Sequence, residues 1–113
     1  MARRGEIYYV DWSAGRGAEQ AGIRPALIVQ NDTGNQFSPT TIVAAISAQR
    51  CQPYPFQVLV MGQESGLTQT SVIKCEQIHS IDQGRLGRLV GTLPAVKMDE
   101  ADLALHRSLG LEH

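Results

Sequence analysis

Five short runs of apolar and β-branched residues, each bounded by glycine, proline or polar residues, follow one another along the first 78 residues. Such runs are typical of short β-strands, and here they are Glu6–Asp11, Arg24–Gln30, Thr41–Ser47, Phe56–Met61 and Ser71–Ile78. Beyond Pro94 the pattern changes to a helical period, with Met98, Ala101, Leu105 and Leu109 on one face. The sequence therefore predicts a mainly β (α+β) fold, a small β-barrel of five to seven short strands with a C-terminal helix.

The segments between these runs carry turn signals. Asn31–Thr40 and Gly62–Gly66 are predicted to be a turn-rich connection and a polar turn, and Asp82–Val90 a turn plus a short strand or piece of helix. The acidic residues of Asp99–Asp102 are expected in the first turn of the C-terminal helix, where the helix dipole favours negative charge. A short chain with several strands leaves sheet edges open, and we expect a homodimer to cover the remaining edge.

Length and composition limit the domain count and the partners. The 113 residues are enough for one domain, predicted over residues 1–110, and Leu111-Glu112-His113 resembles the start of an expression tag. A formal net charge of −1 argues against holding duplex DNA by bulk charge. The absence of a signal-peptide core and of a membrane-length apolar run predicts a cytoplasmic protein. The two cysteines and three histidines lack metal-ligand spacing, so no metal or cofactor is expected.

Two residues at strand ends are the candidate catalytic groups. Arg24 follows a glycine-rich loop and opens a strand, where its planar, permanently charged fork can bind a phosphate. The alternative is that Arg24 pairs with a carboxylate such as Glu19 or Glu76 and only fixes the loop. Ser47 ends the next strand, where its hydroxyl can bind a phosphate oxygen; the alternative is that it satisfies a backbone group.

Other residues carry side chains that can contact a phosphate or an unpaired base. Lys74 and Glu76 lie two apart in one strand and share a face, so they can place a cation and a carboxylate beside one phosphate, or form a solvated ion pair. Tyr54 and Phe56 flank Pro55 and can stack on unpaired bases, or can pack locally. Polar side chains suited to reading base edges are Glu19, Gln20, Gln49 and Gln77.

The chain resembles the MazF/PemK (Kid) family of bacterial toxins, and most closely its Gram-positive-type MazF branch. The matching stretches, in family order, are Arg4–Tyr8, Glu19–Pro25, Leu27–Asp32, Gly34–Thr40, Ile42–Ser47 and Cys75–Asp82. The resemblance implies an SH3-like barrel of the CcdB/PemK type, a homodimer and a cognate MazE-like antitoxin whose acidic segment occupies the RNA groove. It also implies sequence-specific, metal- and ribosome-independent cleavage of single-stranded RNA, which inhibits translation and growth.

The resemblance also assigns roles to individual residues. Arg24 matches the catalytic arginine, and Ser47 stands where the family usually has a catalytic threonine. Glu76 and Lys74 match the acidic and basic positions of the Kid branch, whereas Ala18 replaces that branch's histidine. Two alternatives stay open: a non-enzymatic, CcdB-like toxin that binds gyrase, and an inactive relative that binds only antitoxin or RNA.

Overall fold

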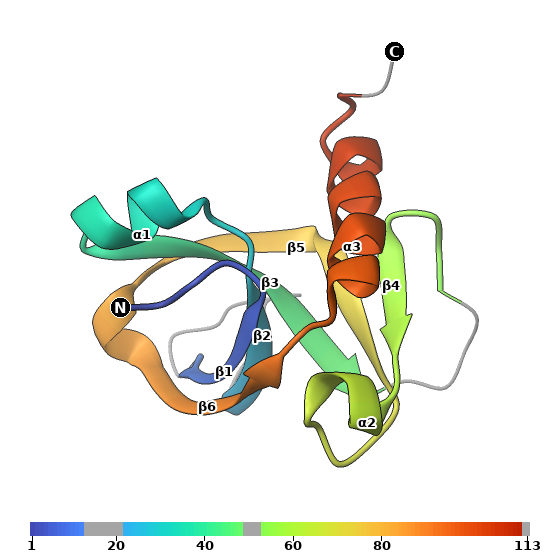
Figure 1. Ribbon diagram of the computed structural model, residues 1–113, viewed down its shortest axis with the longest axis horizontal. Helices are drawn as coiled ribbons and strands as arrows, with labels where there is room; N and C mark the ends of the chain where they lie inside the picture. The colour runs from blue at the N-terminus through green and yellow to red at the C-terminus, as the bar shows by residue number, and fades with distance from the viewer. Residues whose placement is uncertain (13–21, 49–52, 112–113) are drawn as a thin grey trace.

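The computed structural model describes residues 1–12, 22–48 and 53–111, and its core is one antiparallel sheet of six strands (Figure 1). The strands lie in the order β4-β5-β3-β2-β1-β6. Their bounds are Glu6–Asp11 for β1, Ile23–Ile28 for β2, Thr40–Ala48 for β3, Gln57–Val60 for β4, Ser71–Asp82 for β5 and Leu86–Thr92 for β6. The five predicted strands and the mainly β class with a C-terminal helix are thereby confirmed.

A bulge in β5 bends the sheet. Ala44 of β3 pairs with Ile78, but the next residue, Ala45, pairs with Lys74, so residues 75–77 have no counterpart on β3. Extra residues in one strand increase its local twist, and the curved sheet buries apolar side chains on both of its faces. One cluster, covered by the C-terminal helix, contains Ile7, Leu27, Ile46, Ile73, Cys75 and Ala101, and the other contains Val10, Trp12, Ala26, Ile28, Val43 and Ile81.

The hydrogen-bonded sheet does not close into the expected barrel, because its edge strands β4 and β6 form no ladder with each other. The short helix α2, Gly62–Ser65, follows β4 and lies beside the end of β6 (Figure 1). The approach is close: a Cβ added to Gly91 of β6 would lie 2.6 Å from the carbonyl oxygen of Ser65. A Cβ on Gly66, whose φ is +82°, would lie 2.5 Å from the carbonyl oxygen of Val90. Helix α2 therefore occupies the opening between the two edge strands.

The C-terminal helix α3 spans Ala95–Ser108 and packs Ala101 and Ala104 against the sheet. It begins directly after Pro94, so its first turn contains no acidic residue and the expected placement of Asp99–Asp102 is wrong. Leu109 follows the helix and is 57% exposed, so it does not continue the buried face as the periodicity predicted.

Two segments predicted as turns contain short helices. In α1, Asp32–Phe37, the Asn31 side chain caps the helix by accepting a hydrogen bond of 2.7 Å from the Gly34 N–H. Asn35, only 1% exposed, accepts from Thr41 Oγ1 and donates to the Gln30 carbonyl, which joins α1 to β3.

The Gly62–Gly66 segment contains α2, and the Asp82–Val90 segment consists of a 3₁₀ turn, η1 (Gln83–Arg85), followed by β6. The two forms expected for the latter segment, a turn and a short strand, are thus both present. Within the part of the chain that the structure describes, no helix is long and apolar enough to cross a membrane.

Candidate active site

Arg24 and Ser47 lie at the same end of the sheet and line the same pocket. Strands β2 and β3 pair Leu27 with Ala44 and Ala26 with Ala45, and this register, continued along both strands, places Arg24 opposite Ser47. Both residues line a pocket of about 190 Å³. The remaining lining residues are Tyr9, Ile23, Pro25, Ile46, Ala48, Leu67, Thr68, Gln69 and Ser71.

The Ser47 hydroxyl is buried, and in the described part of the chain its Oγ has no hydrogen-bond partner. The alternative that Ser47 satisfies a backbone group is therefore wrong. Leaving a buried polar group unpaired costs roughly 1–3 kcal/mol, and such groups are uncommon enough in folded proteins to require an explanation. An unpaired hydroxyl beside an arginine in a pocket can accept or donate one more hydrogen bond to a ligand.

Arg24 is an exposed residue of β2 at the mouth of this pocket. In the sheet it pairs with Val10 of the neighbouring strand β1. Because a guanidinium keeps its charge at every physiological pH and carries several N–H donors in one plane, it can bind a phosphate at the pocket mouth. Arg24 and Ser47 thus bring a cation and a hydroxyl to the lining of one pocket.

Lys74 and Glu76 lie on β5, outside the pocket. Ser47 pairs with Val72, so Lys74, two residues further along β5, is a diagonal neighbour on the same face, a geometry that long side chains can span. Glu76 is exposed, and its Oε2 accepts a hydrogen bond of 2.7 Å from Gln57 Nε2. Lys74 and Glu76 form no ion pair with each other, so the alternative of a solvated ion pair between them is wrong.

Tyr54 and Phe56 stack on each other, with ring centroids 5.4 Å apart and an interplanar angle of 7°. The alternative of local packing is therefore confirmed for the two ring faces that stack on each other. The Tyr54 residue nevertheless remains 64% exposed. Arg107 Nη1 of α3 donates to the Pro55 carbonyl at 3.1 Å and fixes this segment against the helix. Neither ring lines the pocket of Arg24 and Ser47.

Some predicted contact residues fall elsewhere. Glu19, Gln20 and Gln49, like Ala18, lie outside the described residues, and Gln77 is half-buried within the β5 bulge.

The wall of the pocket formed by residues 67–69 and Ser71 was not predicted from the sequence. The polar run Thr68–Ser71 was a signal, but it is the pairing of Ser71 with Ala48 of β3 that places the run beside the pocket. A second missed feature is an edge-on contact between the rings of Trp12 and His79, 4.9 Å apart at 61°. Trp12 Nε1 and His79 Nε2 are buried without a hydrogen-bond partner among the described residues.

Cys75 is buried in the core and does not belong to the site. Burial, with smaller effects of Glu76 and Asp102, raises the pKa of the Cys75 thiol to about 12. A thiol with this pKa remains protonated near neutrality and is a poor nucleophile. The described residues include no group of three or more His, Cys, Asp or Glu side chains that could hold a metal ion.

The structure is a small, curved β-sheet protein in which an arginine and a hydroxyl without a partner among the described residues line one pocket. Comparison of the sequence with known families identifies the family to which the chain belongs. The chain belongs to the family described as PemK-like, MazF-like toxins of type II toxin-antitoxin systems, whose family model matches residues 3–109. The expected family and its function class are thereby confirmed, and they are favoured over the gyrase-binding and inactive alternatives.

Individual relatives agree with this assignment. The chain is 45% identical over 112 residues to a Bacillus subtilis (strain 168) protein named Endoribonuclease EndoA, covering 98% of this chain and 97% of the relative. A solved mycobacterial endoribonuclease in complex with its cognate antitoxin superposes with a TM-score of 0.84 at 25% identity, over 100% of this chain and 99% of that one. MazF from Deinococcus radiodurans, at 24% identity, shows the same fold with a TM-score of 0.79 over 96% of each chain.

Proposed function

We propose that this protein is the toxin of a toxin-antitoxin pair and cuts single-stranded RNA at specific sequences, with Arg24 and Ser47 at the cleaved phosphate. The observation that carries the proposal is the buried hydroxyl of Ser47, which has no partner within residues 1–12, 22–48 and 53–111 and lies in the pocket that Arg24 also lines. Family membership and the endoribonuclease name of the Bacillus subtilis relative support it.

The proposed reaction uses the ribose 2′-OH as the nucleophile and needs neither a metal ion nor the ribosome. The 2′ oxygen loses its proton and bonds to phosphorus, the bond from phosphorus to the 5′ oxygen breaks, and that oxygen takes up a proton. The products are a 2′,3′-cyclic phosphate and a 5′-OH end. The protein's contribution is to hold the 2′ oxygen in line and to stabilise the charge that develops on the phosphate.

The residues divide these tasks. Arg24 stabilises the phosphate charge through one N–H and protonates the leaving 5′ oxygen through another, and the Ser47 hydroxyl donates to a phosphate oxygen. Glu76 is the proposed base, and its hydrogen bond with Gln57 holds its carboxylate in place. Lys74, as the diagonal neighbour of Ser47, binds a neighbouring phosphate.

The flanking residues are proposed to recognise bases. The exposed face of Tyr54, backed by Phe56, suits stacking on an unpaired base. Gln77 is proposed to contact a base edge from β5, and Glu19, Gln20 and Gln49 to do so from the segments that flank the site.

We also propose a cytoplasmic homodimer that is inhibited by an antitoxin. Exposed apolar side chains support an interface: Phe37 on α1 is 77% exposed, and Ile42 on β3 is 36% exposed. The mycobacterial relative solved with its cognate antitoxin supports the same kind of partner here. An acidic antitoxin segment would place carboxylates where the RNA phosphates lie.

The test is cleavage of a long RNA of varied sequence by the purified protein in EDTA, beside Arg24→Ala, with the cut ends mapped. We expect discrete cuts by the wild type alone, with cyclic phosphate and 5′-OH ends. Cutting by both proteins would remove Arg24 from the site. An absence of cutting by folded wild-type protein would refute the proposed function.

A further inference from the structure

A second pocket adjoins the candidate active site. It has a volume of about 370 Å³ and is lined by Tyr9, Asp11, Ile23, Arg85, Gly87 and Arg88. Tyr9 and Ile23 also line the pocket of Arg24 and Ser47. We call this second pocket the β1–β6 groove. Because the two pockets share two lining residues, an extended polymer bound at Arg24 can continue along the protein surface into the groove.

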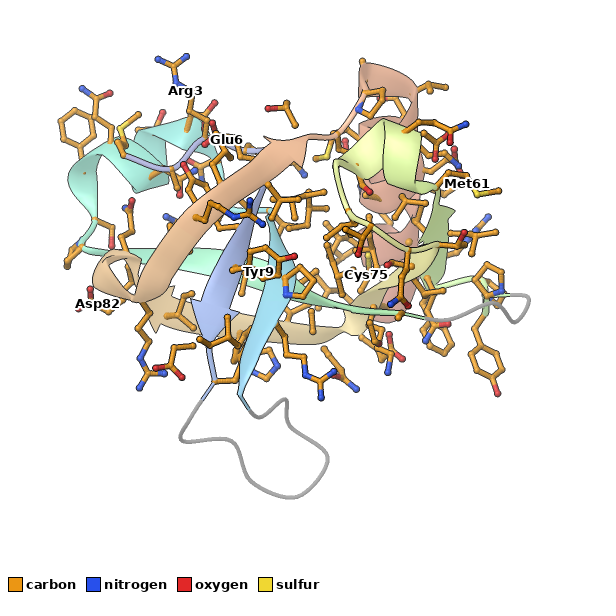
Figure 2. The ribbon with its side chains drawn as sticks, turned by 90° about the horizontal axis from the view of Figure 1, so that it is seen from below. Arg3, Glu6, Tyr9, Met61, Cys75 and Asp82 are labelled. Atoms are coloured by element: carbon orange, nitrogen blue, oxygen red, sulfur yellow. The ribbon has the colours of Figure 1, made fainter. Side chains whose placement is uncertain are left out.

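The groove carries the two kinds of side chain that bind single-stranded nucleic acid, namely cations and an aromatic ring. Arg88 lies over the ring of Tyr9, with its Cζ 5.3 Å from the ring centroid. Tyr9 belongs to β1, which pairs with β6, and Figure 2 shows it over strands β1 and β2. Arg85 and Arg88 are both exposed, and neither forms a salt bridge within the described residues.

The contact with Tyr9 prepares Arg88 for binding. A cation–π contact holds the guanidinium over one ring face, so less side-chain freedom is lost when its N–H groups bind a phosphate. Ile23, which is 72% exposed, offers an apolar surface beside the ring for the face of a base. Gly87 lets β6 pass close to β1 at the groove wall, because a Cβ there would lie 3.2 Å from the Tyr9 carbonyl oxygen.

The charge of the groove favours a polyanion. Its two arginines face one carboxylate, Asp11, among the six lining residues, and Arg24 adds a third guanidinium next door. This concentration is local, because the whole chain has a net charge of −1. The lining therefore favours a flexible chain of phosphates and bases over an uncharged ligand.

We propose that the β1–β6 groove binds the single-stranded RNA substrate beyond the cleaved phosphate, with Arg88 and Arg85 on its backbone and Ile23 and Tyr9 against a base. This inference rests on the proposed function, because it extends the path of the same RNA. The groove then adds affinity for long RNA, and it helps to determine which flanking nucleotides are accepted.

The test measures how much affinity is gained by lengthening the RNA. Two RNAs that share a mapped cut site, with a 2′-deoxy nucleotide there to prevent cleavage, are compared: a short one and one extended on both sides. Binding is followed by fluorescence anisotropy for the wild type, Arg88→Ala, Arg85→Ala and Arg3→Ala. Arg3 is the matched control, because it is an exposed arginine that lines neither pocket and lies well apart from Tyr9 (Figure 2).

For the wild type and Arg3→Ala we expect extension to tighten binding about tenfold, equivalent to about 1.4 kcal/mol. Arg88→Ala should lose most of this gain, and its salt dependence on the long RNA should fall by about 0.7 in log–log slope, the value for one phosphate of a single strand. Arg88→Lys should recover the salt slope more than the gain, because lysine keeps the charge without the planar contact to Tyr9.

The inference is overturned if Arg88→Ala keeps the same gain as Arg3→Ala, or if the wild type shows no gain. A loss of dimerisation, or of binding to an acidic antitoxin peptide, with the RNA gain intact would assign the groove to a protein partner and also overturn it. If the protein cuts no RNA, the same variants are compared on short and long pools of unstructured RNA. If the long pool binds the wild type more tightly than the short pool does, and Arg88→Ala loses this difference, the groove is an RNA-binding site although the protein does not cleave RNA.

Discussion

Replacement of Ser47 by alanine should change stability and activity in opposite directions. The Ser47 hydroxyl is buried and has no hydrogen-bond partner among the residues that the structure describes, and an unpaired buried polar group costs roughly 1–3 kcal/mol. Some of this is offset by the packing that the oxygen provides, so we expect Ser47→Ala to be more stable by about 1 kcal/mol, or about 4 °C in Tm. Cleavage should fall by about 10²–10³-fold, the loss typical of removing one donor to a developing oxyanion.

Ser65 provides the matched control for stability. It is 1% exposed, donates to the Met61 carbonyl at 3.0 Å and accepts from the Leu67 N–H at 3.1 Å. Ser65→Ala leaves the buried Leu67 N–H without its acceptor, whereas the Met61 carbonyl still accepts from the N–H groups of Glu64 and Ser65, and the variant should lose roughly 1–3 kcal/mol. Urea unfolding gives the stabilities, and single-turnover cleavage of a mapped RNA gives the rates. The reasoning is refuted if Ser47→Ala loses stability as Ser65→Ala does, or if it cuts RNA at the wild-type rate.

Three further predictions concern the site and its frame. Ser47→Thr should keep or raise the single-turnover rate, because threonine retains the hydroxyl and restricts its rotamers; a loss as large as that of Ser47→Ala would contradict this. Gly91→Ala should destabilise the protein in urea, because the new Cβ would lie 2.6 Å from the Ser65 carbonyl oxygen; unchanged stability would mean that α2 does not pack on β6 as described. The pKa of the Cys75 thiol is about 12 in the folded protein, against an ordinary value of 9.0. The unfolded chain therefore loses this proton at lower pH, and stability should fall as pH rises from about 9 to about 12. Urea unfolding over that range should show a smaller fall for Cys75→Ala, and an equal fall would show that other groups cause it.

Most of the strands and the C-terminal helix could be predicted, because they depend on local sequence patterns. The β-branched runs fixed the approximate positions of five strands, and the helical period after Pro94 indicated α3. Helices α1 and α2 were missed because tertiary contacts hold them. Asn35 of α1 is bonded to Thr41 of β3, and α2 packs on β6. Glycine and polar residues in such segments are equally typical of turns.

Sequence patterns pointed to Arg24 and Ser47, but not to the geometry that places both in the lining of one pocket. Sequence patterns placed Arg24 and Ser47 at strand ends, but only the register of β2 on β3 brings them together. The bulge at residues 75–77 and the wall from Leu67 to Ser71 depend on contacts between distant segments, which periodicity does not show. The missing partner of the Ser47 hydroxyl is likewise a property of the packed structure.

The most direct measurement is a crystal structure of the protein with its mapped RNA, carrying a 2′-deoxy nucleotide at the cut site to prevent cleavage. The account predicts a non-bridging oxygen of the cleaved phosphate about 2.7 Å from Ser47 Oγ and about 2.9 Å from an Arg24 guanidinium nitrogen. An RNA bound with that phosphate elsewhere, and with the Ser47 hydroxyl still unpaired, would contradict the account.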